Sequence, residues 1–197
     1  MLRDAGIAHG LRYGILRYFN VAGADPDGRA GQSTPAATHL VKVAAQVALG
    51  LRPKLEIYGE DYDTPDGTCI RDYIHVSDLA AAHVLALARL ETGGASFIFN
   101  CGYGRGASVR EVIEAIERAA GCALPVVSAP RRAGDPPSLV ARADRIRDAL
   151  GWRPAHDDLD LIARTALAWE RKLRSSNEST PARSGRVPES ANATRNS

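Results

Sequence analysis

Long apolar runs are absent from this 197-residue chain, and cysteine is scarce. No segment approaches the roughly 18 apolar residues that a membrane helix needs, and charged residues interrupt the first twenty positions, which excludes the apolar core of a signal peptide. The three cysteines (Cys69, Cys101 and Cys122) are far apart and form neither a zinc pattern nor a disulfide framework. They suit a reducing compartment, so we predict a cytoplasmic protein without a membrane partner.

A strong charge of either sign is also lacking, because the chain has 25 basic and 23 acidic side chains. A net charge of +2 is too weak to indicate a nucleic-acid partner. The segment 175–197 has no aromatic residue and little aliphatic content beyond alanine, so it cannot offset its chain entropy, and we predict a disordered tail there. Its glycosylation sequons at Asn177 and Asn192 are interpreted as chance matches.

Strands and helices alternate through the rest of the chain. Short runs of aliphatic, β-branched and aromatic residues predict strands over 13–19, 55–58, 96–100 and 125–128. Helices are predicted over 38–49, 79–90, 109–120, 145–150 and 159–173. The expected N-caps are Asp78, Ser108 (in a capping box with Glu111), Asp144 and Asp158, and the expected glycine stops include Gly50, Gly121 and Gly151. Such alternation indicates an α/β fold with some parallel sheet.

One glycine-rich segment has the spacing of a dinucleotide-binding loop. Gly102, Gly104 and Ala107 fit G-x-G-x-x-G/A between a predicted strand and a predicted helix. The acidic residue expected about 20 positions later is missing, because Cys122–Ser128 contains no Asp or Glu. We therefore interpret the segment as a turn that lets a helix pack closely on its strand.

Four longer strings carry more information than this loop. They are LRYFNVAGADPDG (16–28), DGTCIRDYIHVSDLA (66–80), APRRAGDPPSLVA (129–141) and LGWRP (150–154). In order and spacing they resemble the C-terminal half of the UDP-glucose 4-epimerases, a family of extended short-chain dehydrogenases/reductases, over about residues 1–173. The resemblance implies a small substrate-binding domain plus the last strands and helices of a Rossmann-type parallel sheet, with the N-terminal NAD-binding half missing.

The resemblance also implies a division of the chain and an activity. Residues 1–20 and 76–101 would be remnants of the Rossmann sheet, and the rest of 1–174 would mainly bind substrate. The implied activity is the interconversion of UDP-galactose and UDP-glucose in carbohydrate metabolism, with NAD as cofactor. The full-length enzyme would be a homodimer. Strands 13–19 and 96–100 would then lack neighbours and expose apolar edges.

The resemblance assigns individual residues by matching positions. Phe19 corresponds to a residue beside the nicotinamide. The positions that correspond to substrate contacts are Asn20, His39, Leu40, Glu56, Ile57, Tyr58, Arg71, Arg132, Asp135 and Leu139. Arginine suits the phosphates because its planar fork makes charge-assisted hydrogen bonds, and a helix beginning near His39 would offer backbone N–H groups to the diphosphate.

Several of these positions also have plain structural interpretations. Phe19 and Tyr58 could pack in a core, His39 could lie on a helix surface, and Arg132 could simply pair with Asp135. Arg131 is interpreted as structural or solvent-facing. Asp72, Tyr73 and His75 are interpreted as scaffold that holds loops in place.

A catalytic pair of the family has no counterpart in the sequence. Lysine occurs only at positions 42, 54 and 172, and none lies four residues after a tyrosine, so there is no Tyr-x-x-x-Lys. The chain is therefore predicted to be an epimerase or an inactive fragment of one. The alternatives are a non-catalytic sugar-nucleotide-binding fragment and a related nucleotide-sugar dehydratase or decarboxylase.

Leu139 bears on substrate choice. It matches a position where family members vary between tyrosine and smaller residues, and the larger residue narrows the sugar pocket. We expect leucine to leave room for UDP-N-acetylhexosamines beside the plain UDP-hexoses.

Overall fold

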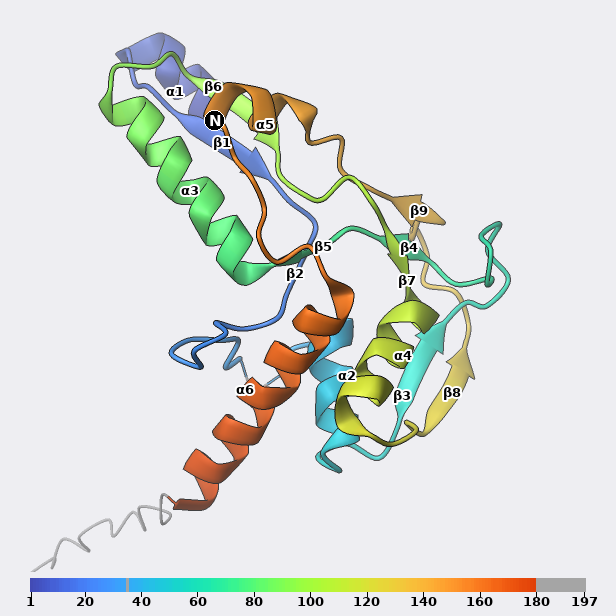
Figure 1. Ribbon diagram of the computed structural model, residues 1–197. Coiled ribbons are helices and arrows are strands. Elements are labelled where there is room, and N and C mark those ends of the chain that lie inside the picture. Colours follow the sequence, from blue (N-terminus) through green and yellow to red (C-terminus); the bar gives the residue numbers. More distant parts are fainter. Residues whose placement is uncertain (35, 180–197) are drawn as a thin grey trace, which may run out of the picture.

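The strands of this chain are short and mostly parallel, and helices connect them (Figure 1). The computed structural model describes residues 1–34 and 36–179. The helices are α1 (Leu2–His9), α2 (Leu40–Ala48), α3 (Val76–Glu91), α4 (Val109–Ala120), α5 (Asp144–Leu150) and α6 (Leu159–Ser179). The strands are β1 (Gly14–Arg17), β2 (Asn20–Ala22), β3 (Leu55–Tyr58), β4 (Ile70–Arg71), β5 (Tyr73–His75), β6 (Phe97–Asn100), β7 (Ala107–Ser108), β8 (Val126–Ala129) and β9 (Ser138–Leu139).

Strand pairing confirms the predicted α/β class with parallel sheet. Strand β1 pairs with β6, β2 with β5, and β3 with β8, each in parallel. A small three-stranded sheet has β4 at its centre, antiparallel to β7 and parallel to β9. Parallel pairs need long crossover connections, and these connections contain α2, α3 and α4.

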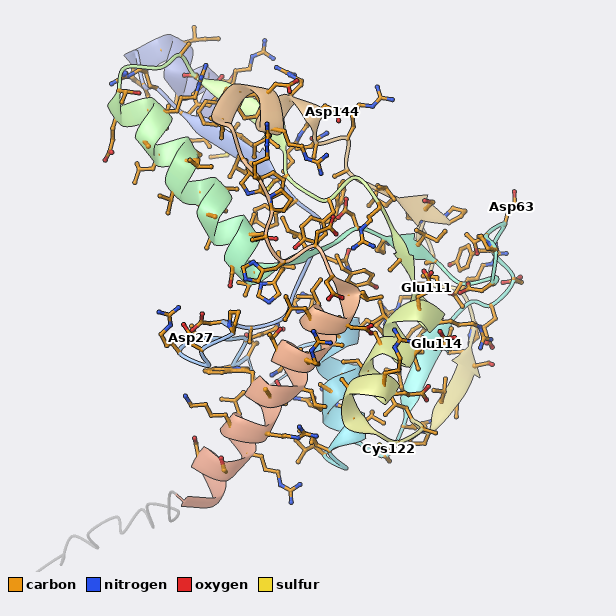
Figure 2. All side chains as sticks on the ribbon, in the orientation of Figure 1. Asp27, Asp63, Glu111, Glu114, Cys122 and Asp144 are labelled. Atoms are coloured by element: carbon orange, nitrogen blue, oxygen red, sulfur yellow. The ribbon has the colours of Figure 1, made fainter. Side chains whose placement is uncertain are left out.

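Several helix ends follow the sequence signals. Ser108 Oγ accepts the N–H of Glu111 at 3.1 Å, and the Glu111 carboxylate accepts the N–H of Ser108 at 2.7 Å, so the predicted capping box opens α4. Figure 2 shows Glu111 at the β7 end of this helix. Gly121 and Gly151, with φ of 74° and 64°, close α4 and α5 in the left-handed conformation. Asp158 accepts the N–H of Asp160 at 2.8 Å, as expected of the cap of α6.

Two predicted N-caps are wrong. Helix α3 begins at Val76 with His75 as its N-cap, and the carboxylate of Asp78 bonds instead to the segment around His156. Asp144 lies inside the first turn of α5, after the N-cap Ala143. The local sequence pattern predicts that Asp78 caps α3, but its carboxylate binds the distant segment around His156 instead.

The predicted tail is also partly wrong. Helix α6 continues to Ser179, five residues into the segment predicted to be disordered from Ser175. The remainder of that prediction, including the sequon at Asn192, concerns residues outside the described part of the chain. Within residues 1–34 and 36–179, no helix is both long and apolar enough to cross a membrane.

Helices α2, α4 and α6 pack against one another, and α2 also contacts β3 (Figure 1). The largest fully buried side chains of the chain include Trp152, Ile74, Ile116 and Ile146. This core supports β3, β4 and the start of α2, which are the elements that carry most of the predicted substrate residues.

Apolar surface remains uncovered at the other end of the molecule, where α1, α3, β1 and β6 lie together (Figure 1). Ile7 on α1 and both Val84 and Leu87 on α3 are more than half exposed. Strands β1 and β6 pair only with each other among the described residues. These exposed apolar side chains thus lie on helices, whereas the apolar residues of β1 and β6 are half-buried or buried.

Candidate functional site

A cavity of about 580 Å³ lies among β2, β3, β4, the start of α2 and the turn 132–135. It brings together residues from segments more than one hundred positions apart in the sequence. Eight of the ten predicted substrate residues line it: Asn20, His39, Leu40, Glu56, Tyr58, Arg71, Arg132 and Asp135.

Three predicted residues lie elsewhere. The side chain of Ile57 is 2% exposed and packs in the core, which leaves only its backbone for the expected ligand contact. Leu139 is on β9, paired in register with Arg71, and is not part of the cavity wall. Phe19 lines a second, larger cavity of about 890 Å³, which shares only His39 with the first.

The alternation of β3 explains why Glu56 and Tyr58 reach the cavity while Ile57 does not, since successive side chains of a strand point to opposite faces. The Tyr58 hydroxyl donates to Glu56 Oε2 at 2.6 Å. Glu56 Oε1 also lies 3.5 Å from Lys54 Nζ. The hydrogen bond from Tyr58, and then the ammonium of Lys54, lower the pKa of Glu56, so this carboxylate is ionised at neutral pH.

Arg132 lies on the ring of Tyr58. Its guanidinium carbon is 3.8 Å from the ring centroid, which is cation–π geometry. The residue opens a tight turn in which the N–H of Asp135 donates to the Arg132 carbonyl, and Gly134 adopts a φ of 85°. A pair between Arg132 and Asp135, the plain alternative for these residues, does not form.

Asp135 pairs with Arg71 instead, at 3.5 Å between Oδ1 and Nη2. Arg71 is largely buried, and its Nη1 donates to the carbonyls of Ile70 and Pro136 at 2.8 and 2.9 Å. The guanidinium is thereby fixed between β4 and the loop after the 132–135 turn. Arg71 and Asp135 come together only through the pairing of β4 with β9.

The first turn of α2 supplies backbone N–H groups to the same cavity. His39 is its N-cap, but the imidazole bonds to Gln32 and makes no cap hydrogen bond. The turn carries no acidic side chain. Free N–H groups at a helix start attract anions.

The sequence prediction missed two cations of the wall. Arg52 donates from Nε to Gln46 Oε1 at 2.7 Å and from Nη2 to the carbonyl of Ala37 at 3.2 Å, and Lys54 faces Glu56. Their signal was a basic pair directly before strand 55–58. With Arg71 and Arg132, the cavity holds four permanent cations and two carboxylates. The surplus of two positive charges suits a diphosphate.

The glycine-rich turn 102–107 binds an internal carboxylate. Asp72 is 1% exposed and accepts the N–H groups of Tyr103, Gly104 and Ala141 at 3.0, 3.0 and 3.2 Å. A Cβ at Gly102 would lie 2.6 Å from Asp72 Oδ2, which explains the glycine. The segment is a tightly packed turn, but it packs on Asp72 and Ala141 and does not bring a helix close to its strand, while Asp72 holds loops together as scaffold.

A second buried carboxylate supports the scaffold from α3. Asp78 accepts hydrogen bonds from the Tyr103 hydroxyl and from His156 Nδ1, both at 2.7 Å. Burial alone would raise the pKa of Asp78, but these donors and the N–H of Ala155 together lower it. The imidazole of His75 stacks on that of His156 with centroids 4.6 Å apart, and burial lowers the pKa of His75.

Comparison with known proteins identifies relatives of this chain. A family model described as the NAD dependent epimerase/dehydratase family matches residues 1–102. The chain belongs to this family. A UDP-glucose 4-epimerase of Azospirillum brasilense is 69% identical over 176 residues, which are 89% of this chain and 51% of that protein.

Solved structures of the epimerase/dehydratase family agree with the fold. The UDP-glucose 4-epimerase of Brucella ovis in complex with NAD superposes with a TM-score of 0.82 at 50% identity, covering 85% of this chain and 52% of that one. The enzyme of Bifidobacterium longum in complex with NAD+ and UDP gives 0.81 at 40% identity, covering 87% and 51%. The chain thus spans about half the length of the relatives it matches.

The described residues of this epimerase/dehydratase chain do not form an NAD site by themselves. The glycine-rich turn cannot cradle a pyrophosphate, because two of its N–H groups already donate to Asp72. Phe19, the residue expected beside the nicotinamide, lines the larger cavity together with apolar side chains such as Tyr18, Val21 and Trp169.

Proposed function

We propose that this chain forms the UDP-binding side of a UDP-glucose 4-epimerase. The observation that carries the proposal is the 580 Å³ cavity, which joins a cationic wall, a helix start and an aromatic ring. Family membership and the 69% identity to a UDP-glucose 4-epimerase support the same assignment. The substrates we propose are UDP-galactose and UDP-glucose.

Different parts of the cavity bind different parts of the nucleotide. Arg71, Arg52 and the first turn of α2 form the wall that binds the diphosphate, because their donors are fixed before the ligand arrives. The ring of Tyr58 stacks with uracil. The carboxylate of Asp135 accepts from ribose hydroxyls, and Asn20, at the start of β2, donates to the sugar.

These residues bind the sugar nucleotide but do not catalyse its epimerisation. Inverting C4 of a hexose requires a hydride acceptor and a base, and the sequence has no Tyr-x-x-x-Lys. This absence favours a sugar-nucleotide-binding role for the 197 residues taken alone. Homodimerisation, and the admission of N-acetylated sugars at Leu139, stay predictions.

Calorimetric titration with UDP tests the proposal. We expect UDP to bind, and Arg132→Ala to weaken binding by about 1.5–3 kcal/mol, roughly ten- to a hundredfold in Kd, because a charge-assisted phosphate contact is lost. The matched control is Arg131→Ala. Arg131 pairs with Asp61 at 2.6 Å and lies outside the cavity, so its loss should leave the affinity unchanged. Absence of UDP binding by the parent chain would refute the proposed function.

A further inference from the structure

The position of Arg132 in the cavity has a consequence for ligand choice. Its guanidinium covers the ring of Tyr58 at 3.8 Å from the centroid, and both side chains line the cavity. A planar base that stacks on this ring needs the space that the guanidinium occupies. The same guanidinium is a donor for phosphate, so one side chain takes part in two mutually exclusive arrangements.

Glu56 favours the covered arrangement. Its carboxylate accepts from the Tyr58 hydroxyl at 2.6 Å, which fixes the ring, and its negative charge attracts Arg132 toward the same place. The backbone of the 132–135 turn does not compete for the guanidinium, which is exposed to solvent. A ligand must therefore provide a stronger anion than Glu56 to draw Arg132 off the ring.

We propose that Arg132 makes this cavity selective for nucleoside diphosphates over nucleosides, because the diphosphate draws Arg132 away and uncovers Tyr58 for the base. The inference rests on the proposed function of the cavity. A nucleoside carries no anion, so it must displace the arginine unaided. UDP exchanges the contact on Tyr58 for charge-assisted hydrogen bonds to phosphate.

The neighbouring arginine gives a matched comparison. Arg131 lies over the ring of Tyr62 at 4.3 Å and pairs with Asp61, so it repeats the arrangement of cation, ring and carboxylate outside the cavity. Substituting it removes a similar contact in the same loop without touching the cavity wall. Any effect confined to Arg132 therefore reports on the cavity.

The experiment measures the affinities of uridine and of UDP for the parent, Arg132→Ala, Glu56→Gln and Arg131→Ala chains. In Arg132→Ala we expect uridine to bind about two- to fivefold more tightly, the factor that a cation–π contact at a partly exposed site corresponds to, while UDP binds at least tenfold more weakly. Glu56→Gln should also tighten uridine binding, because it loosens Arg132. Arg131→Ala should match the parent for both ligands.

A second measurement follows the ring itself. With ¹³C-labelled tyrosine, inorganic pyrophosphate alone should shift the Tyr58 ring resonances of the parent as the guanidinium leaves, and should not shift them in Arg132→Ala. If uridine binding is unchanged or weaker in Arg132→Ala while the parent binds UDP, the selectivity inference is wrong and the proposed function stands. If the parent binds neither UDP nor pyrophosphate, both are wrong.

Discussion

The 197-residue chain should convert no measurable UDP-galactose to UDP-glucose, even with NAD supplied. General acid–base catalysis alone contributes about 10²–10⁴-fold, and epimerisation at C4 also requires a hydride acceptor held against the sugar. The sequence has no tyrosine followed four residues later by lysine, and its glycine-rich turn binds Asp72. We therefore expect neither a catalytic pair of the family's type nor a dinucleotide loop to act in this chain.

A coupled assay for UDP-glucose formation tests this prediction. The same preparation should bind UDP by calorimetry, which shows that the cavity is intact while turnover is absent. A full-length UDP-glucose 4-epimerase serves as the positive control for the assay. NAD-dependent turnover above background by the purified chain would show that a catalytic pair has been overlooked.

The second large effect is expected at Asp72. Asparagine keeps one oxygen, which can accept at most two of the three backbone N–H groups, so at least one buried N–H loses its acceptor and faces the new amide N–H₂. At about 1–3 kcal/mol for each unsatisfied group, the unpaired N–H and the unpaired amide together should lower the free energy of unfolding by about 2 kcal/mol or more. The loss would free the 102–107 turn and Ala141, which join β4, β6 and β9.

Urea unfolding followed by tryptophan fluorescence suits this test, because Trp152 is 1% exposed. The matched control is Asp157→Asn, since Asp157 forms an ion pair with Arg105 that is open to solvent and worth less than about 1 kcal/mol. A loss below about 1 kcal/mol in Asp72→Asn would mean that the backbone N–H left without the carboxylate finds another acceptor.

Local signals in the sequence predicted the longer elements well. The capping box of Ser108 and Glu111 depends on residues three apart, so sequence alone contains the whole interaction. Strand β3 was predicted with its observed bounds, because Leu55, Ile57 and Tyr58 follow a basic, proline-containing turn. In contrast, β4, β7 and β9 have two residues each, too few for any periodicity to be visible.

The site was predicted by matching residues to a family, and its geometry depends on contacts that no local pattern contains. Arg71 and Asp135 meet only because β4 and β9 pair, and Asp78 leaves its expected cap position for His156, seventy-eight residues away. Arg52 and Lys54 were missed because their place in the cavity wall depends on how α2 packs beside β3. The stacking of Arg132 on Tyr58 could not be seen in either segment alone.

The buried contacts of Asp72 and the cations of the cavity differ in how they respond to dissolved salt. Asp72 is enclosed by backbone donors away from water, where mobile ions screen little, whereas Lys54 and Arg132 line the cavity and are exposed, so ions screen their charges over a Debye length of about 8–10 Å. Raising the ionic strength therefore weakens the attraction of the cavity for an anionic ligand and leaves the contact that holds the 102–107 turn in place. Ligand release by salt and retention of the fold are, for this chain, separable properties.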